Sequence, residues 1–219
     1  MKTRKTSTLW FASGSLAAFI LWTLLVRRID VQSIGPNGSS VGFAALNAAF
    51  HRLTGVHMTL YALTDWLGLV PLGIVMGFAV LGLVQLIRRK SILKVERSIL
   101  ILGVFYIAVL SAYLFFEKVV INYRPLLIGG RPEASYPSST TMLALCVLPT
   151  AIMQLNGRIR NAFVRRAALG LLAVLTVFMV IGRLLSGVHW VSDIIGGILL
   201  SGGLDALYAF AVSAPDTLP

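Results

Sequence analysis

The stretch WLGLVPLGIVMGFAVLGLVQLI, residues 66–87, contains no charged side chain and is followed at once by the basic residues 88–90. An apolar run of this length is a candidate transmembrane helix, because about 20 helical residues cross the hydrocarbon core of a bilayer. The sequence therefore predicts an all-α integral membrane protein with six transmembrane helices. The other five runs lie at about 8–26, 98–121, 138–156, 167–185 and 189–213.

The composition excludes most classes of soluble protein. Hydrophobic residues make up 57% of the chain and charged residues only 12%, and the mean hydropathy is +0.86. Disordered and nucleic-acid-binding domains are not this apolar, although the net charge of +11 would otherwise suggest a nucleic-acid partner. The single cysteine, Cys146, excludes an intrachain disulfide. We expect one membrane domain over residues 1–219, with membrane lipids and no nucleic acid as partners.

Basic residues are divided unevenly between the two sides of the predicted bundle. Twelve belong to the N-terminus and to the second and fourth connections, and seven lie in or beside the first, third and fifth. Because cytoplasmic loops carry the excess of Lys and Arg, we expect a multi-pass protein of the cell membrane with both termini cytoplasmic. The connection 27–65 is then outside, and its apolar stretch 41–50 is expected to lie along the membrane interface.

Three polar stretches lie at the outer ends of the predicted spans. They are EKVVINYRP at 117–125, YPSSTT at 136–141 and RLLSGVHWVSD at 183–193. Ionisable residues at membrane depth are costly and are commonly functional. The predicted topology places all three stretches on one side of the membrane, so we expect them to converge into one pocket.

His189 and Asp193 are four residues apart at the start of a predicted helix and therefore share one side of it. A carboxylate there binds one imidazole nitrogen, which leaves the other free as a nucleophile or base. Arg183 would present a planar set of donors to a phosphate. The alternative is that His189 and Asp193 only tie helix ends together, and their spacing does not decide between the two.

The residues SSTT at 138–141 begin another predicted span. Free N–H groups at a helix N-terminus favour anions, but hydroxyl side chains in this position also cap helices, and the two roles are compatible. Arg124 precedes Pro125 at the end of the third span. The alternative to a phosphate contact there is an arginine that extends to the interface.

Together, these stretches resemble the three-part signature of the type 2 phosphatidic acid phosphatase family, integral membrane phosphatases related to vanadium haloperoxidases. The family pattern is Lys, six residues, Arg-Pro; then Pro-Ser-Gly-His; then Ser-Arg, five residues, His, three residues, Asp. The third part is present as Arg183, His189 and Asp193 with the family spacing. The order of the parts and the six-span topology also agree.

The resemblance implies a mechanism that needs no metal and no other cofactor. His189 would attack phosphorus to form a phosphohistidine, and Asp193 would orient it. Arg124 and Arg183 would hold the phosphoryl oxygens and supply the positive charge that a metal otherwise gives. The remaining contacts to the phosphate are expected from Ser138, Ser139 and Thr140.

The first part of the signature departs from the family pattern. Counting back from Arg124 puts Glu117 where the family has lysine, with Lys118 one place late. The lysine role therefore stays open between Glu117 and Lys118. A second register pairs Arg124 with the dipeptide 131–132, but it leaves a short link to the second part. We prefer the first register, and Arg124 is expected to bind phosphate in either.

The other two parts each lack one family residue. Thr140 replaces the histidine that protonates the leaving group, and Gly182 replaces the serine before Arg183. Threonine is a poor acid. The remaining histidines, His51 and His57, lie in the first outer connection. One of them folding over the pocket would restore an acid, but a hydrogen-bonded interfacial histidine is the simpler interpretation.

Loss of a general acid costs about 10²- to 10⁴-fold in rate, and most for basic leaving groups. A lipid monophosphate must expel an alkoxide, whereas a lipid diphosphate expels a phosphate monoester anion that hardly needs a proton. We therefore predict a membrane phosphatase acting on an isoprenoid diphosphate, such as the undecaprenyl diphosphate of bacterial wall synthesis. The alternatives are a broader phosphatidate or phosphatidylglycerol phosphate phosphatase and a non-catalytic lipid-phosphate binder or transporter.

Overall fold

The computed structural model describes the backbone of residues 2–213 and the side chains from Lys5 onward. Within this range, six helical segments are long and apolar enough to cross a membrane, which confirms the predicted fold class. They are α1 (Lys2–Val26), α3 (Met58–Leu67) with α4 (Leu69–Arg89), α5 (Arg97–Lys118), α6 (Ser139–Arg158), α7 (Ala162–Leu185) and α8 (Val191–Ser213).

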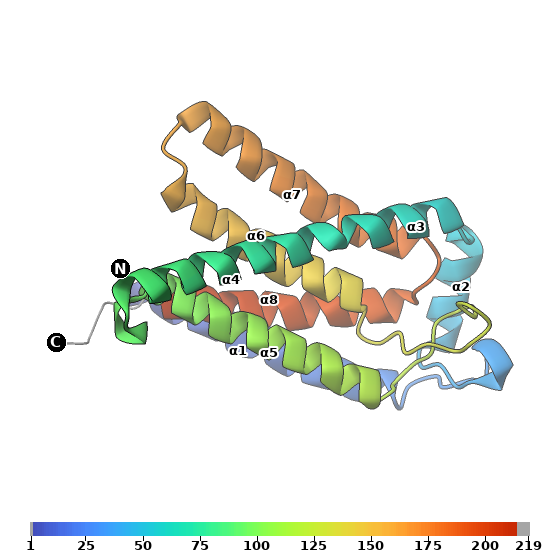
Figure 1. Ribbon diagram of the computed structural model, residues 1–219. Coiled ribbons are helices and arrows are strands. Elements are labelled where there is room, and N and C mark those ends of the chain that lie inside the picture. The colour runs from blue at the N-terminus through green and yellow to red at the C-terminus, as the bar shows by residue number, and fades with distance from the viewer. Residues whose placement is uncertain (1, 214–219) are drawn as a thin grey trace.

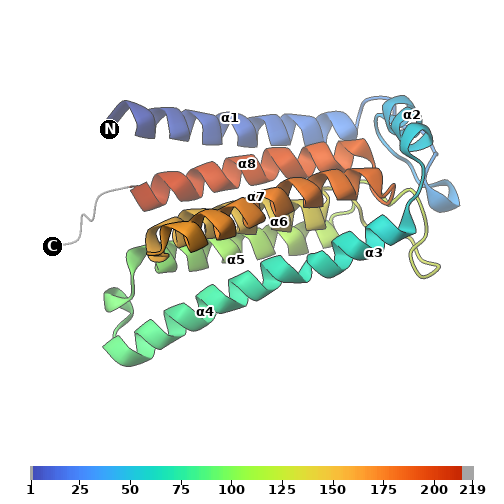
Figure 2. The same ribbon diagram turned by 90° about the horizontal axis from the view of Figure 1, so that it is seen from above.

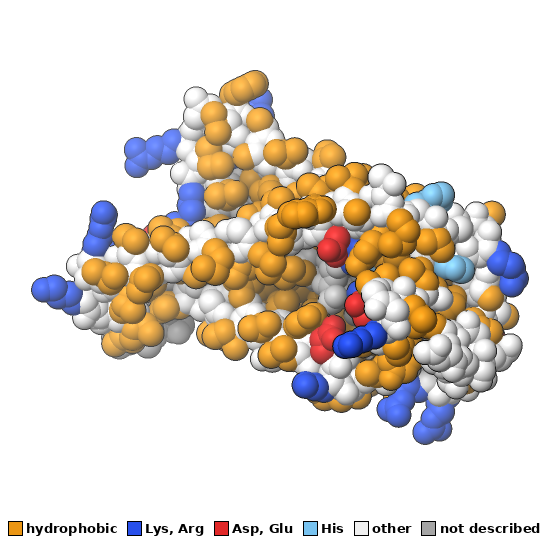
Figure 3. Space-filling view, turned by 45° about the vertical axis from the view of Figure 1, so that its right-hand side comes forward, with side chains coloured by type: hydrophobic (Ala, Val, Ile, Leu, Met, Phe, Trp, Pro, Cys, Tyr) orange, Lys and Arg blue, Asp and Glu red, His pale blue; other side chains and the backbone are white. Residues whose placement is uncertain are grey.

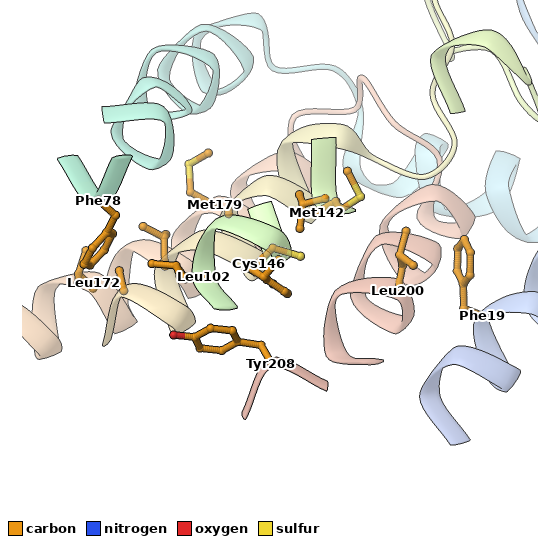
Figure 4. Close-up of a cluster of buried hydrophobic side chains, with 14 of the residues drawn as sticks. Phe19, Phe78, Leu102, Met142, Cys146, Leu172, Met179, Leu200 and Tyr208 are labelled. Carbon is orange, nitrogen blue, oxygen red and sulfur yellow. The ribbon is translucent and has the colours of Figure 1, made fainter. Parts of the chain in front are cut away.

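Helix α6 lies at the centre of the bundle. It packs against α7 and α8 and also contacts α4 and α5, while α1 lies along α8 (Figures 1 and 2). Side chains from several helices meet around α6, as Figure 4 shows for Met142 and Cys146 of α6, Leu102 of α5 and Tyr208 of α8. Because lipid tails are as apolar as these side chains, close packing rather than escape from water holds such helices together.

The two ends of the bundle differ in their connections. At the first end lie the start of α1, the end of α8 and the short connections 90–96 and 159–161 (Figure 2). We call it the terminal end, and it holds the segments that carry the twelve basic residues. The opposite, loop end holds the connections 27–57, 119–138 and 186–190, including helix α2 (Ala44–Thr54) (Figure 1).

The structure changes several predicted boundaries. The second span begins at Met58 rather than at residue 66, because α3 continues into α4 with only Gly68 between them. The polar residues of α3 interrupt the apolar run, so the sequence predicted a later start for this span. The third span ends at Lys118, a turn before the predicted residue 121. The stretch predicted to lie along the interface contributes to α2, whose residue Leu53 is 83% exposed.

Candidate functional site at the loop end

The loop between α7 and α8 carries His189 and is held by a tight contact with the segment after α2. Gly187 has a φ of +72°, and a Cβ at this position would lie 2.1 Å from the carbonyl oxygen of Gly55. Only glycine fits such an approach in this conformation. The backbone N–H of His57 also donates to the carbonyl of Ser186 at 3.0 Å. These two contacts hold the loop in place within three residues of His189.

His189 and Asp193 face each other at the start of α8, as their spacing predicts. Both are buried, and His189 Nδ1 lies 3.7 Å from Asp193 Oδ2. The same carboxylate oxygen accepts the backbone N–H of Trp190 at 3.0 Å. This separation is too long for a hydrogen bond, and a small shift of either side chain would complete one.

Arg124 fixes the protonation of the His189 ring. Its Nη1 lies 3.1 Å from His189 Nε2. A guanidinium only donates hydrogen bonds, so Nε2 must accept and the ring proton must sit on Nδ1, toward Asp193. Burial lowers the pKa of His189 to about 4, and the positive charges of Arg124 and Arg183 add to this effect against the opposing influence of Asp193. The ring is neutral at pH 7, with its lone pair on Nε2.

Arg124 belongs to a hairpin that the sequence did not predict. Its backbone N–H donates to the carbonyl of Glu133 at 3.0 Å, and its Nε lies 2.9 Å from Glu133 Oε2 in an ion pair. Arg131 is exposed at the turn, so Arg124 is the arginine of this segment that reaches His189. Glu117 and Lys118 are exposed at the end of α5, and neither is hydrogen-bonded or ion-paired to another described residue.

Arg183 is directed toward α3 and is 1% exposed. Its Nη1 lies 3.2 Å from the Thr64 hydroxyl, and its Nη2 lies 3.4 Å from Asp65 Oδ1. The guanidinium also sits 4.8 Å from the centre of the Tyr61 ring. Tyr61, Thr64 and Asp65 were missed by the sequence analysis, which placed them before the second span.

The packing of α3 explains the missing motif serine. A Cβ on Gly182 would lie 2.8 Å from the Thr64 methyl carbon, so a serine fits there only if Thr64 moves. Thr64 occupies this space and brings its own hydroxyl to Arg183. Position 182 offers no hydroxyl, and the Thr64 hydroxyl of α3 lies beside Arg183.

The start of α6 combines capping with free donors. The Ser138 hydroxyl accepts the N–H of Thr141 at 3.4 Å, and the Ser138 N–H donates to the carbonyl of Asp193 at 3.1 Å. Among the described residues, no acceptor binds the N–H groups of Ser139 and Thr140. Ser138 therefore joins α6 to α8, while the next two residues present donors suited to an anion.

Neither of the other histidines contacts Thr140. His57 Nε2 lies 2.8 Å from the carbonyl of Thr54, and the His51 ring packs 5.6 Å from that of Trp190. Burial lowers the pKa of His51, which makes it a poor proton donor at neutral pH. The structure thus brings no histidine to the position of the missing acid.

An apolar groove of about 1080 Å³ runs between α4 and α5 against α6. Asp65, Ser139 and Thr140 line its polar end, and Leu86 and Ile92 line the end nearest the termini. In Figure 3, acidic and basic side chains gather at one edge of a hollow with hydrophobic walls. This arrangement suits an amphiphile with an anionic head and a long hydrocarbon chain.

The described residues contain no group of three or more His, Cys, Asp or Glu side chains placed to hold a metal ion. Independence from metal stays a prediction about the reaction.

Comparison with known proteins identifies the family. The sequence model of the PAP2 superfamily matches residues 74–214, which is most of the chain. The chain belongs to the PAP2 superfamily. This PAP2 protein is also similar to a transmembrane PAP2-type phosphatidylglycerolphosphate phosphatase from Bacillus subtilis, with 18% identity and a TM-score of 0.58 over 95% of this chain and all of the other. No curated protein matches it.

Family membership supports a hydrolase that removes phosphate from lipids in the membrane. The match begins at residue 74 and therefore leaves out α3, which contributes Thr64 and Asp65 to the surroundings of Arg183.

Proposed function

We propose that this PAP2 protein hydrolyses an isoprenoid diphosphate, such as undecaprenyl diphosphate, through a phosphohistidine on His189. The observation that carries the proposal is Thr140, which stands where the family has its acid and lies at the polar end of the groove. The neutral His189 ring supports the nucleophile role, and Arg124 and Arg183 are the expected phosphate ligands.

In the first step, Nε2 of His189 attacks the terminal phosphorus and the bond from that phosphorus to the bridging oxygen breaks. Arg124 covers Nε2 at 3.1 Å, so its guanidinium must transfer its hydrogen bond to a phosphoryl oxygen as the substrate arrives. Positive charge then develops on the ring, and Asp193 stabilises it from the Nδ1 side. Water attacks the phosphohistidine in the second step and releases inorganic phosphate.

The leaving group decides how much the absence of an acid matters. With a lipid diphosphate, the leaving group of the first step is a lipid monophosphate, which is a stable anion without an added proton. With phosphatidate, the leaving group is the alkoxide of the diacylglycerol, for which a missing acid costs about 10²- to 10⁴-fold in rate. A site with Thr140 in this position is therefore better suited to a diphosphate.

The groove is the proposed place for the isoprenoid chain, because its apolar walls run from Thr140 toward the opposite face of the membrane. We also propose that the loop end faces outward and both termini face the cytoplasm, since the basic segments gather at the terminal end. A cysteine at Gly130 should then react with an impermeant thiol reagent on intact cells, and one at Asn161 should not.

The second candidate is a phosphatidylglycerol phosphate or phosphatidate phosphatase. The structural likeness to the Bacillus subtilis phosphatidylglycerolphosphate phosphatase favours it. The same nucleophile and arginines would serve this reaction, but the leaving alkoxide would need a proton from a source other than Thr140.

Phosphate release by purified protein tests the proposal, with undecaprenyl or farnesyl diphosphate compared with phosphatidate and phosphatidylglycerol phosphate. We expect a preference for diphosphate of at least about tenfold, with His189→Ala as the inactive control. Thr140→His should raise the rate on phosphatidate more than on diphosphate. Equal rates on all lipids would contradict the leaving-group argument, and binding without release would indicate a non-catalytic lipid-phosphate protein.

A further inference from the structure

Three buried polar side chains surround the carboxylate of Asp193. Asn122 donates to Asp193 Oδ1 at 3.1 Å, and the Ser192 hydroxyl lies 3.4 Å from the same oxygen. Asn47 of α2 donates to the Ser192 hydroxyl at 2.9 Å and accepts the Ser192 backbone N–H at 3.2 Å. Asn47, Asn122 and Ser192 are each at most 2% exposed.

We infer that Asn122 and Asn47 are positioning residues that hold Asp193 in the orientation its partnership with His189 requires. The inference rests on the proposed function and adds to it residues that the family signature does not specify. Asn47 also lies outside the matched segment 74–214.

The hydrogen bonds divide the two carboxylate oxygens between different tasks. Oδ1 takes the donors from Asn122 and Ser192, whereas Oδ2 takes only the Trp190 N–H and faces His189 Nδ1. Rotation of the carboxylate would break contacts on both oxygens at once. The donors on Oδ1 thus keep Oδ2 directed at the histidine.

The same donors set the strength of the Asp193 carboxylate as a partner. A hydrogen bond to a charged group stabilises the charge, so the bond from Asn122 takes up part of the negative charge of the carboxylate. The charge that remains stabilises a protonated His189 ring less, which favours the neutral ring. Asn122 therefore contributes to the neutral nucleophile through Asp193.

Asn47 connects this arrangement to the first outer segment of the chain. Its two bonds to Ser192 tie α2 to the start of α8. It also donates to the carbonyl of Gly42, just before α2, at 2.7 Å. The Asn122 carbonyl accepts the Ser135 N–H at 2.9 Å, which ties the hairpin to the same point. Three separate segments thus meet at one carboxylate.

The test compares Asn122→Leu and Asn47→Leu with Gln154→Leu, a control that removes a buried amide from α6 far from His189. We expect Asn122→Leu to lower kcat about 10- to 100-fold with little change in KM. The acid limb of its kcat/KM profile should move to higher pH by about 0.5 to 1 unit, because a carboxylate without the Asn122 donor stabilises the protonated His189 ring more. Asn47→Leu should give a smaller shift in the same direction, and Gln154→Leu none.

All variants are measured with the same substrate, so ionisation of the substrate affects every pH profile equally and does not change the differences between variants. A limb that stays in place or moves to lower pH would leave Asn122 with a packing role only and overturn the inference. If Asn122→Leu does not fold, Ser192→Ala removes one donor to Oδ1 with minimal change and must shift the limb upward.

A readout without turnover separates this inference from the proposed function. If the wild-type protein hydrolyses no lipid phosphate, the function fails, but the titration of His189 can still be followed by NMR. Asn122→Leu must then raise the pKa of His189 relative to wild type. An unchanged or lower value would overturn the positioning role independently of activity.

Discussion

Both ends of the bundle hold arginine and carboxylate side chains, but their polar atoms are paired to different degrees. At the terminal end, Gln85 and Glu96 exchange two hydrogen bonds of 2.9 Å, and Arg158 binds both Glu96 and Gln154. No polar side-chain atom of these four residues is buried without a partner. At the loop end, His189 Nδ1 is buried and has no hydrogen-bond partner.

The loop end contains further unpaired atoms, among them Arg183 Nε and the Thr141 hydroxyl. A buried donor without a partner is costly, so this end gains stability from a ligand that supplies acceptors. The four residues of the terminal-end network have no such atom. We therefore propose that the loop-end network serves binding and the terminal-end network serves cohesion of the bundle. Variants at the two ends should then separate activity from stability.

The largest effect is expected for His189→Ala. Removing the nucleophile should lower kcat by roughly 10⁴-fold or more, because no other group replaces the covalent step. Phosphate release from the preferred lipid measures the loss. The matched control is His57→Ala, which removes a histidine bonded to a backbone carbonyl and should keep activity. Comparable activity in both variants would mean that His189 is not the nucleophile.

Asp193→Asn should lower kcat by about 10²- to 10⁴-fold, since an amide favours the wrong tautomer of His189. The melting temperature in detergent, measured beside the rate, should change much less than kcat. An intact rate in this variant would mean that Arg124 alone sets the ring, and the role of the carboxylate would have to be withdrawn.

Gly182→Ser tests the contact between α3 and α7. The added side chain meets the Thr64 methyl carbon, where a Cβ would lie at 2.8 Å, and should displace Arg183. We expect KM to rise several-fold. The double variant with Thr64→Ala should recover part of this loss, because the space is relieved and the serine hydroxyl is restored beside Arg183. Identical KM values in the single and double variants would argue against competition between Ser at position 182 and Thr64 for the space beside Arg183.

The smallest effect on activity is expected for Arg158→Met. It should lower the melting temperature by a few degrees and leave kcat/KM unchanged, because the ion pair is partly exposed and contributes about 1 kcal/mol or less. The hydrogen bond from Arg158 holds the pKa of Glu96 below its usual value. Its contribution is therefore present at neutral pH and is lost as pH falls through that lowered pKa. A large drop in the activity of Arg158→Met would contradict the assignment of the terminal-end network to stability alone.

The sequence predicted the bundle well because bilayer thickness fixes the length of an apolar span. It also predicted that His189 and Asp193 face each other, although α8 begins only at Val191 and His189 lies in the loop before it. The contact between Arg124 and His189 was not predicted, and the catalytic and binding roles of these residues stay proposals.

The remaining neighbours depend on contacts between distant segments, which periodicity does not reveal. Thr64 meets Arg183, and Glu133 meets Arg124 through an unpredicted hairpin. Asn47 is the single amide side chain within the apolar stretch 41–50. A buried amide in such a stretch needs partners, and that requirement was a usable signal.

The groove between α4 and α5 has a kinetic consequence. Several of its lining residues are on the surface of the bundle, including Leu72, Leu83, Val104 and Ile107, which are 48% to 69% exposed. A lipid chain can therefore enter from within the bilayer while its head group stays at the membrane surface. The rate should then follow the mole fraction of substrate in the membrane rather than its bulk concentration, and added inert lipid or detergent should slow the enzyme by dilution in two dimensions.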